Sequence, residues 1–308
     1  MEKDKNLFAI HIRTMNIHSI LQRSSVQILR KSSYGTGFLF RYEGMNFLCT
    51  NKHIISGMQH EYDFEIKSDV ACVFCGFAQG VSNSLKKENP YPNYKRVVYS
   101  PKDMIWSYSE TFDLAVGLFP SSFDYTAPNC DIFIFPYISK WRDTGFFWHN
   151  LEVADEVVLF GFPRAIFKTD GIPLSFMRKG YISRLFNSDL DLGKFKFTII
   201  IDGMTMPGMS GSPVFRIKHL NDKDSNCDQV ILGASIRFLG LINQSLYDEV
   251  TFQNTKILLN DNFTIVQPAN EIGNLAQNLI EKIKKDKDLD FKPSRNTGFR
   301  NQFVDFKV

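Results

Sequence analysis

Apolar and polar positions alternate in short segments along the body of the chain. The first such segments are Val26–Arg30, Phe38–Tyr42 and Met45–Thr50. Alternation of this kind predicts half-buried β-strands, and the Glu43-Gly44 pair predicts a hairpin turn between the last two of them. The glycines of Gly35-Thr36-Gly37 predict a further turn ahead of the second strand.

A second series of apolar segments follows farther along the chain. An aspartate opens the run 113–118, and scattered prolines mark residues 119–150 as a long connection. Many short strands separated by turns predict a β-sandwich or a barrel. The strand content is similar on either side of the connection, which predicts two units. The segments beyond the connection are 156–163, 177–183, 197–202 and 229–236.

The two ends of the chain depart from the strand pattern. Apolar residues in 7–24 recur at partly helical spacing, which predicts an arm or short helix packed on the body. Ile272, Leu275 and Leu279 mark one face of an amphipathic helix behind Pro268. The predicted organisation is an N-terminal arm (1–24), a first strand unit (25–135), a second strand unit (136–267), a C-terminal helix (268–286) and a polar tail (287–308).

Composition and charge narrow the classes of function. The chain has 308 residues, of which 44% are hydrophobic, and a formal net charge of +3. That charge is too small to predict binding to nucleic acid or to an anionic membrane. No apolar run has the length of a membrane span. The first residues mix acidic and basic side chains, which is atypical of a signal peptide, so we expect a cytoplasmic protein.

The cysteines do not have the pattern of a disulfide framework. They number five, and their scattered positions predict reduced thiols. Cys72 and Cys75 have the spacing of half a zinc site, but no second close Cys/His pair accompanies them. We therefore interpret them as a pair of core thiols and expect no metal and no cofactor.

One glycine-flanked turn carries candidate chemistry. Gly208-Met209-Ser210-Gly211-Ser212-Pro213 runs directly into the apolar Val214-Phe215. Glycines allow backbone conformations that would expose a serine hydroxyl and direct neighbouring N–H groups at one point. An acyl-transfer nucleophile and its oxyanion hole need that geometry. Serine and glycine are also ordinary turn residues, so this motif alone is weak evidence.

Two further residues precede this turn in the chain. His53 follows the apolar strand 45–50, and it is either a half-buried histidine with one hydrogen bond or a general base on a rigid strand end. Asp113 opens an apolar strand, where it is either an exposed strand-start aspartate or the partner that orients an imidazole. Each is weak evidence alone, but the order His53, Asp113, Ser210 matches one known triad order.

On these motifs the chain resembles the trypsin/chymotrypsin-like serine peptidase superfamily. Thr50-Asn51-Lys52-His53 resembles the family's Thr-x-x-His, residues 113–116 resemble its Asp-Ile/Leu-Ala strand, and residues 208–213 resemble its Gly-Asp-Ser-Gly-Gly-Pro turn. Gly35-Thr36-Gly37-Phe38 and Gly161-Phe162-Pro163 are similar to bacterial, HtrA-type and other non-zymogen members. The resemblance covers roughly residues 25–265, and three motifs in the right order are specific.

The resemblance implies an all-β fold of two antiparallel six-stranded barrels, a chymotrypsin-like double barrel with the site between its halves. His53 and Asp113 come from the first barrel and Ser210 from the second. It implies that Ser210 attacks a peptide carbonyl, His53 moves the proton and Asp113 orients His53. The N–H groups of Gly208 and Ser210 then bind the oxyanion.

Two positions depart from the digestive members of the family. Met209 stands where those members have an aspartate that pairs with a newly cut N-terminus, so activation by trimming is not expected. Met204 stands at the base of the specificity pocket, where trypsins have aspartate, so a preference for Arg or Lys is not supported. Met204, Thr205, Ser235 and Arg237 are the candidates for lining this pocket.

A serine endopeptidase acting on a protein or peptide substrate is the function that these residues favour. One alternative is a catalytically silent module that binds a peptide or protein on the same scaffold, because fold does not determine function. The other is a coincidence of turns and strand ends in an unrelated β-protein. We also expect a regulatory protein partner, since an unregulated protease in the cytoplasm would be harmful.

Overall fold

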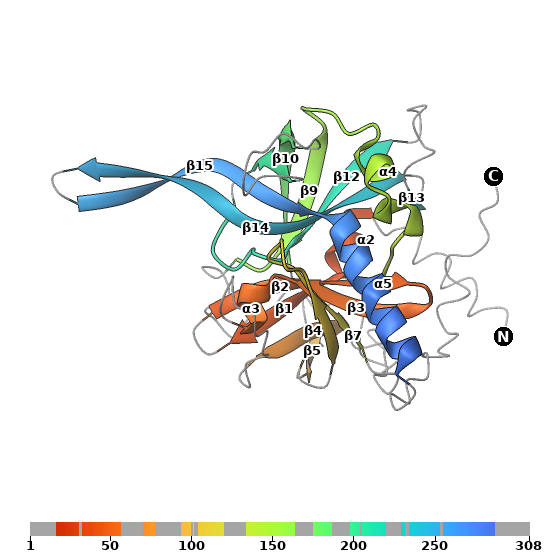
Figure 1. The fold of residues 1–308 in the computed structure, drawn as a ribbon. Coiled ribbons are helices and arrows are strands. Elements are labelled where there is room, and N and C mark those ends of the chain that lie inside the picture. The colour runs from red at the N-terminus through yellow and green to blue at the C-terminus, as the bar shows by residue number, and fades with distance from the viewer. Residues whose placement is uncertain are drawn as a thin grey trace, which may run out of the picture.

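The computed structural model contains two β-sheets and a long C-terminal helix. In Figure 1 one sheet lies above the other, and the helix α5 (Ala269–Lys285) begins beside the upper sheet and runs down the side of the lower one. The structure describes residues 17–30, 33–56, 70–77, 94–99, 101, 104–119, 134–163, 175–186, 198–203, 205–219, 229–231, 234–252 and 255–286.

The first sheet is built from the N-terminal half of the chain. Its eight strands have the order β5-β4-β1-β2-β3-β7-β6, and β8 pairs in parallel with β2. Every other pairing in this sheet is antiparallel. The strands are β1 (Ser25–Arg30), β2 (Ser33–Tyr42), β3 (Met45–Thr50), β4 (Ala71–Phe77), β5 (Tyr94–Tyr99), β6 (Ile105–Tyr108), β7 (Ala115–Leu118) and β8 (Phe135–Pro136).

The second sheet closes into a barrel. Its path runs β12-β9-β10-β11-β15-β14-β13, and an additional pairing of β12 with β14 closes six of these strands into a ring. β14 and β15 continue past the barrel as a two-stranded ribbon (Figure 1). The strands are β9 (Glu156–Gly161), β10 (Phe176–Leu185), β11 (Ile199–Asp202), β12 (Pro213–His219), β13 (Gln229–Ile231), β14 (Ala234–Phe252) and β15 (Thr255–Pro268).

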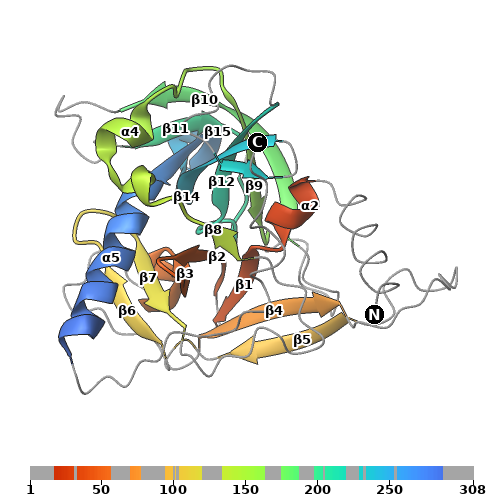
Figure 2. The same ribbon diagram turned by 90° about the vertical axis from the view of Figure 1, so that its right-hand side faces the viewer.

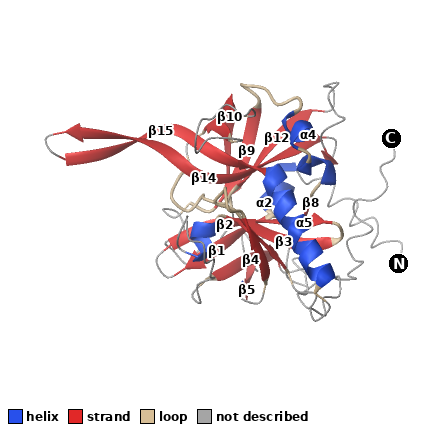
Figure 3. Cartoon of the chain, in the orientation of Figure 1, coloured by secondary structure: helices blue, strands red, loops and turns tan. Residues whose placement is uncertain are grey.

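Among the described residues, the helices lie at the edges of the sheets (Figure 3). α5 buries the face that the sequence pattern predicted, including Ile272, Leu275 and Leu279, so the prediction of a C-terminal amphipathic helix is confirmed. This helix lies against β6 and β7 of the first sheet and against β14 of the second (Figure 2). The shorter helices are α2 (Ile17–Gln22), α3 (Lys52–Ser56), the 3₁₀ helix η2 (Ser139–Arg142) and α4 (Thr144–Trp148).

The all-β class with a six-stranded barrel and a C-terminal helix is as predicted. The first sheet differs from a six-stranded antiparallel barrel: it has eight strands, one of them paired in parallel, and among the described strands no pairing joins β5 to β6. The prediction of a turn at residues 35–37 was wrong, because β2 runs through them. Gly35 and Gly37 serve packing instead, since a Cβ on either would collide with Ile54 or Leu48.

The predicted N-terminal arm, C-terminal tail and loops lie partly outside the described residues. The N-terminal arm is described only from Ile17, where α2 begins, and the tail 287–308 lies outside, as do most of the residues between β3 and β6. The predicted connection 119–150 contains β8, η2 and α4. Within the described ranges, no helix has both the length and the apolar character needed to cross a membrane.

An aromatic cluster joins the two sheets. Phe38 of β2 lies 5.7 Å from Phe135, 5.6 Å from Phe215 of β12 and 4.5 Å from Phe238 of β14, measured between ring centroids. All four rings are fully buried. Burying an aromatic ring removes a large apolar area from water, and tilted ring pairs add to this stabilisation. The cluster therefore fixes the orientation of the first sheet relative to the second.

We expect Phe38→Ala to lower the free energy of unfolding by about 3–5 kcal/mol, because it leaves a cavity between the two sheets. Tyr181→Ala is the matched control, since the Tyr181 side chain is 52% exposed. This control is expected to change stability by no more than about 0.5 kcal/mol. Denaturant unfolding of both variants is the measurement, and equal stabilities would contradict a shared aromatic core.

Candidate active site

His53 lies on a short helix at the end of a strand of the first sheet. β3 ends at Thr50, and α3 begins at Lys52, so the chain turns sharply within two residues. The side chain of His53 is 27% exposed, whereas its neighbours on α3 are buried. The imidazole is thus held on a rigid element and keeps contact with solvent.

Asp113 lies beside His53 because their strands are paired. β7 begins two residues after Asp113 and pairs with β3, with Ala115 opposite Thr50. The Asp113 Oδ2 atom lies 2.5 Å from Nδ1 of His53, and its Oδ1 accepts the backbone N–H of His53 at 3.1 Å. Asp113 is only 7% exposed. The pairing of β3 with β7 therefore brings together two residues that are sixty positions apart in the chain.

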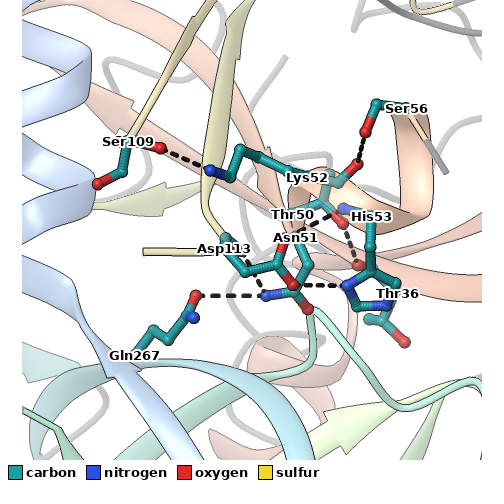
Figure 4. A network of polar contacts seen from close by, with 9 residues as sticks. All are labelled: Thr36, Thr50, Asn51, Lys52, His53, Ser56, Ser109, Asp113 and Gln267. Carbon is teal, nitrogen blue, oxygen red and sulfur yellow. Dashed lines mark hydrogen bonds and ion pairs between the residues drawn. The ribbon is translucent and has the colours of Figure 1, made fainter. Parts of the chain in front are cut away.

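The main chain of Asp113 is held by two buried amide side chains (Figure 4). Asn51 donates from Nδ2 to the Asp113 carbonyl oxygen at 2.8 Å. In the orientation that satisfies its hydrogen bonds, the Gln267 amide spans Asp113: its Nε2 donates to the same carbonyl and its Oε1 accepts the Asp113 N–H, both at 3.0 Å. Amide orientations are assigned from such networks. Figure 4 shows Gln267 approaching Asp113 from the side opposite His53.

Lys52 supports the loop that carries Asp113. Its ammonium is buried and donates to the carbonyl oxygen of Ser109 at 2.7 Å. Ser109 in turn donates from its hydroxyl to Glu271 at the start of α5. Burial lowers the pKa of the Lys52 ammonium, while the nearby Asp113 and Glu110 act in the opposite direction. A charged group is costly to bury without partners, so the Lys52 ammonium stabilises the arrangement in which it reaches the Ser109 carbonyl.

The turn that contains Ser210 has the backbone that its glycines predict. Gly208 and Gly211 adopt φ angles of 97° and 82°, which only glycine takes without strain. A Cβ on Gly211 would collide with the carbonyl oxygen of Thr36. Ser210 lies between them and is partly exposed. The glycines therefore let the turn lie directly against the first sheet.

Thr36 of β2 links this turn to the strand end that precedes His53. Its N–H donates to the Ser210 carbonyl at 2.9 Å, and its hydroxyl donates to the Gly208 carbonyl at 3.1 Å. The Thr50 hydroxyl donates to the Thr36 carbonyl at 2.8 Å. Ser210 is thereby brought to the same end of the first sheet as His53 and Asp113. His53 and Ser210 are not hydrogen-bonded to each other among the contacts of the described residues.

Backbone N–H groups in the turn divide into two kinds. Met209 donates to the carbonyl of Met206 at 3.0 Å, and Gly211 donates to that of Ile242 at 2.7 Å. Within the described part of the chain, the N–H groups of Gly208 and Ser210 have no acceptor. These two donors lie on either side of Met209, whose own N–H is bonded within the turn.

The structure describes three of the four predicted pocket residues. Met204 lies outside the described residues. Thr205 is buried and contacts Thr264 of β15 through their hydroxyls, 3.1 Å apart. Arg237 is fully buried and donates to the carbonyl of Phe147 at the end of α4.

Strand register separates two of these residues from Ser210. On β14, Leu241 lies opposite Pro213, next to the turn, whereas Arg237 lies opposite Arg216 and Ser235 opposite Lys218. At about 3.4 Å per residue, this places Arg237 and Ser235 roughly 10 and 17 Å along the strand from Pro213. Their role as pocket residues stays a prediction.

Sequence reasoning missed the polar residues that hold the site. Thr36, Asn51 and Gln267 are all buried and make hydrogen bonds to Ser210, Asp113 or their neighbours. The available signal was a polar residue inside an apolar run, such as Gln267 after Ile265-Val266. A buried polar side chain is costly without a partner, so such a position indicates a specific contact.

The described residues contain no cluster of three or more His, Cys, Asp or Glu side chains that could hold a metal ion. The structure does not describe the side chains of Cys72 and Cys75, so their interpretation as a pair of core thiols stays a prediction. Near His53 the structure offers the Asp113 carboxylate, which contacts the imidazole, and the buried Lys52 ammonium.

Comparison with known proteins returns solved structures only. No protein-family model matches the chain, and no curated protein does. Similar structures include the HtrA-type protease AlgW with a tripeptide, at 14% identity over 86% of this chain and 62% of that one, with a TM-score of 0.46. The Rv3671c protease of M. tuberculosis in an inactive form has 15% identity over 84% of this chain and 90% of that one, with a TM-score of 0.41. The serine endoprotease from Yersinia pestis has 14% identity over 87% of this chain and 67% of that one, with a TM-score of 0.44.

We expect Gly211→Ala to destabilise the protein more than Gly44→Ala does. Both glycines have positive φ angles, 82° and 78°, so both variants introduce backbone strain of about 1–2 kcal/mol. Nothing lies within 4 Å of a Cβ on Gly44, whereas one on Gly211 would collide with Thr36. Thermal and denaturant unfolding measure the difference, and equal losses of stability would mean that the turn does not depend on its contact with Thr36.

Proposed function

We propose that this chain is a serine-type endopeptidase in which Ser210, His53 and Asp113 form a catalytic triad. The observation that carries the proposal is the 2.5 Å contact between Asp113 Oδ2 and His53 Nδ1. A buried carboxylate at this distance keeps the proton on Nδ1 and leaves Nε2 as the acceptor. An imidazole with a free Nε2 is the base that a serine nucleophile requires.

The reaction proceeds in two halves. Ser210 Oγ attacks the carbonyl carbon of the peptide while His53 Nε2 takes its proton, and the resulting tetrahedral intermediate collapses to an acyl ester as Nε2 protonates the leaving amine. Water then attacks the ester, with His53 again taking and returning the proton. Asp113 remains ionised throughout and stabilises the imidazolium.

The available N–H groups in the turn support the assignment of an oxyanion hole. The amides of Gly208 and Ser210 have no acceptor among the described residues, although both neighbours on their C-terminal sides donate to carbonyls. Removing one such donor in related chemistry costs about 3 kcal/mol in the barrier. We therefore assign Gly208 and Ser210 as the donors that stabilise the oxyanion.

The side chain of Met209 supports activation by a route other than N-terminal trimming. It is fully buried, and its position next to Gly161 anchors the turn through apolar packing. An apolar anchor cannot pair with a charged N-terminus. We propose that a protein partner or the substrate itself completes the alignment of Ser210 with His53, because these residues are not hydrogen-bonded to each other in the described contacts.

The same missing hydrogen bond favours a second candidate function. A chain that never aligns Ser210 with His53 would bind a peptide or protein at this site without cutting it. Catalytic hydrogen bonds are often long in the absence of substrate, so the observation is compatible with both functions. Chemical reactivity of Ser210 separates them.

A fluorophosphonate label tests the proposal. We expect wild-type protein to be modified at Ser210, and Ser210→Ala and His53→Ala to lose the label and at least about 10⁴-fold in the rate of peptide hydrolysis. Ser212→Ala is the matched control, because Ser212 is buried in the same turn and is expected to keep the label. Mass spectrometry of the labelled peptide identifies the modified residue.

Absence of labelling at Ser210 would contradict the peptidase. The protein is labelled first alone and then with peptide libraries added, so that an activator or substrate in the library can complete the site. A protein that binds library peptides but is never labelled is the binding module. Labelling at a serine other than Ser210 would overturn the triad assignment.

A further inference from the structure

The ribbon of β14 and β15 has its base at the candidate site. Leu241 of β14 lies opposite Gln267 of β15, and the pairing register shifts between Ile242 and Gln244. Such a shift marks a β-bulge, which re-aims the side chain of the extra residue. Here the extra residue is Asn243, whose Nδ2 donates to Oε1 of Gln267 at 3.0 Å.

Gln267 is buried and uses both ends of its amide on one residue. It donates to the carbonyl of Asp113 and accepts from its N–H, while Asn51 occupies the second lone pair of the same carbonyl. Both polar backbone atoms of Asp113 are therefore satisfied by side chains from other elements. A residue held in this way has little freedom to shift its carboxylate away from His53.

The same stretch of β14 holds the turn that carries Ser210. Gly211 donates to the carbonyl of Ile242, and the N–H of Ile242 donates to the carbonyl of Ser212 at 2.9 Å. Asn243 follows Ile242 directly in the chain. Residues 242 and 243 therefore contact the nucleophile turn on one side and, through Gln267, the Asp113 loop on the other.

We propose that Gln267, supported by Asn243, is a positioning residue that sets the orientation of Asp113 and hence of the His53 imidazole. The proposal rests on the proposed function, and it adds that the second barrel supports both the nucleophile Ser210 and the carboxylate residue Asp113. An amide side chain offers a donor and an acceptor side by side, as the two polar backbone atoms of Asp113 require. A carboxylate would lack the donor, and an apolar side chain would leave the N–H of Asp113 buried without a partner.

The test uses Gln267→Met in the full-length protein. Methionine is similar in volume and removes both hydrogen bonds to Asp113. With ¹⁵N-labelled histidine, long-range ¹H–¹⁵N correlation spectra report which nitrogen of neutral His53 carries the proton, and His53→Gln assigns the signal. Wild type is expected to hold the proton on Nδ1, and Gln267→Met is expected to shift part of the population to Nε2.

Tyr137→Phe is the matched control. It removes one buried hydrogen bond, from the Tyr137 hydroxyl to the carbonyl of Ala269, only two residues from Gln267. This variant is expected to lose stability and to leave the His53 tautomer unchanged. Kinetics provide the second readout: Gln267→Met is expected to lower kcat about 100-fold, as for other misplaced catalytic groups, with KM within about twofold of wild type.

An unchanged His53 tautomer in folded Gln267→Met would overturn the proposal. So would an equal shift in Tyr137→Phe, because it would show a general loss of stability. If Gln267→Met does not fold, Asn243→Ala replaces it, and an unchanged tautomer there has the same consequence. The spectra do not depend on hydrolysis, so a shifted tautomer in a protein without peptidase activity rejects the proposed function and retains the positioning role.

Discussion

The structure of the site depends on the burial of one carboxylate. Asp113 is 7% exposed, and an ionised group this far from water is costly unless partners satisfy its oxygens. One oxygen contacts the His53 ring and the other accepts the His53 backbone N–H. Since both bonds go to one residue, any displacement of Asp113 also displaces the imidazole. This explains why so many buried polar groups surround the loop of Asp113.

The contacts between the two sheets also hold Asp113, His53 and Ser210 in position. Phe38, Phe215 and Phe238 fix the orientation of the sheets through apolar packing, which is strong but does not specify distances to a fraction of an ångström. The hydrogen bonds of Thr36 to the turn at Ser210 and of Gln267 to Asp113 add that specificity. Because each sheet supplies one of these residues to the other, the site exists only when both sheets are packed together.

Local patterns in the sequence predicted the elements that depend on neighbouring residues. The apolar face of α5 was visible in the spacing of Ile272 and Leu279, and the positive φ angles of Gly208 and Gly211 followed from the need for a tight turn. The glycines at 35 and 37 were misinterpreted as a turn, because their role is contact with Ile54 and Leu48. Local spacing does not identify packing partners that are distant in the chain.

By itself the sequence determined the all-β class, the C-terminal helix and three candidate residues in a recognisable order, since composition, periodicity and short motifs are local properties. The tertiary structure alone decided that β3 and β7 pair, which brings His53 to Asp113, and that a bulge at Asn243 directs an amide towards Gln267. It also decided that Arg237 and Ser235 lie along β14 away from Ser210. Strand register and bulges are selected by the packing of whole sheets, so no single segment contains the information.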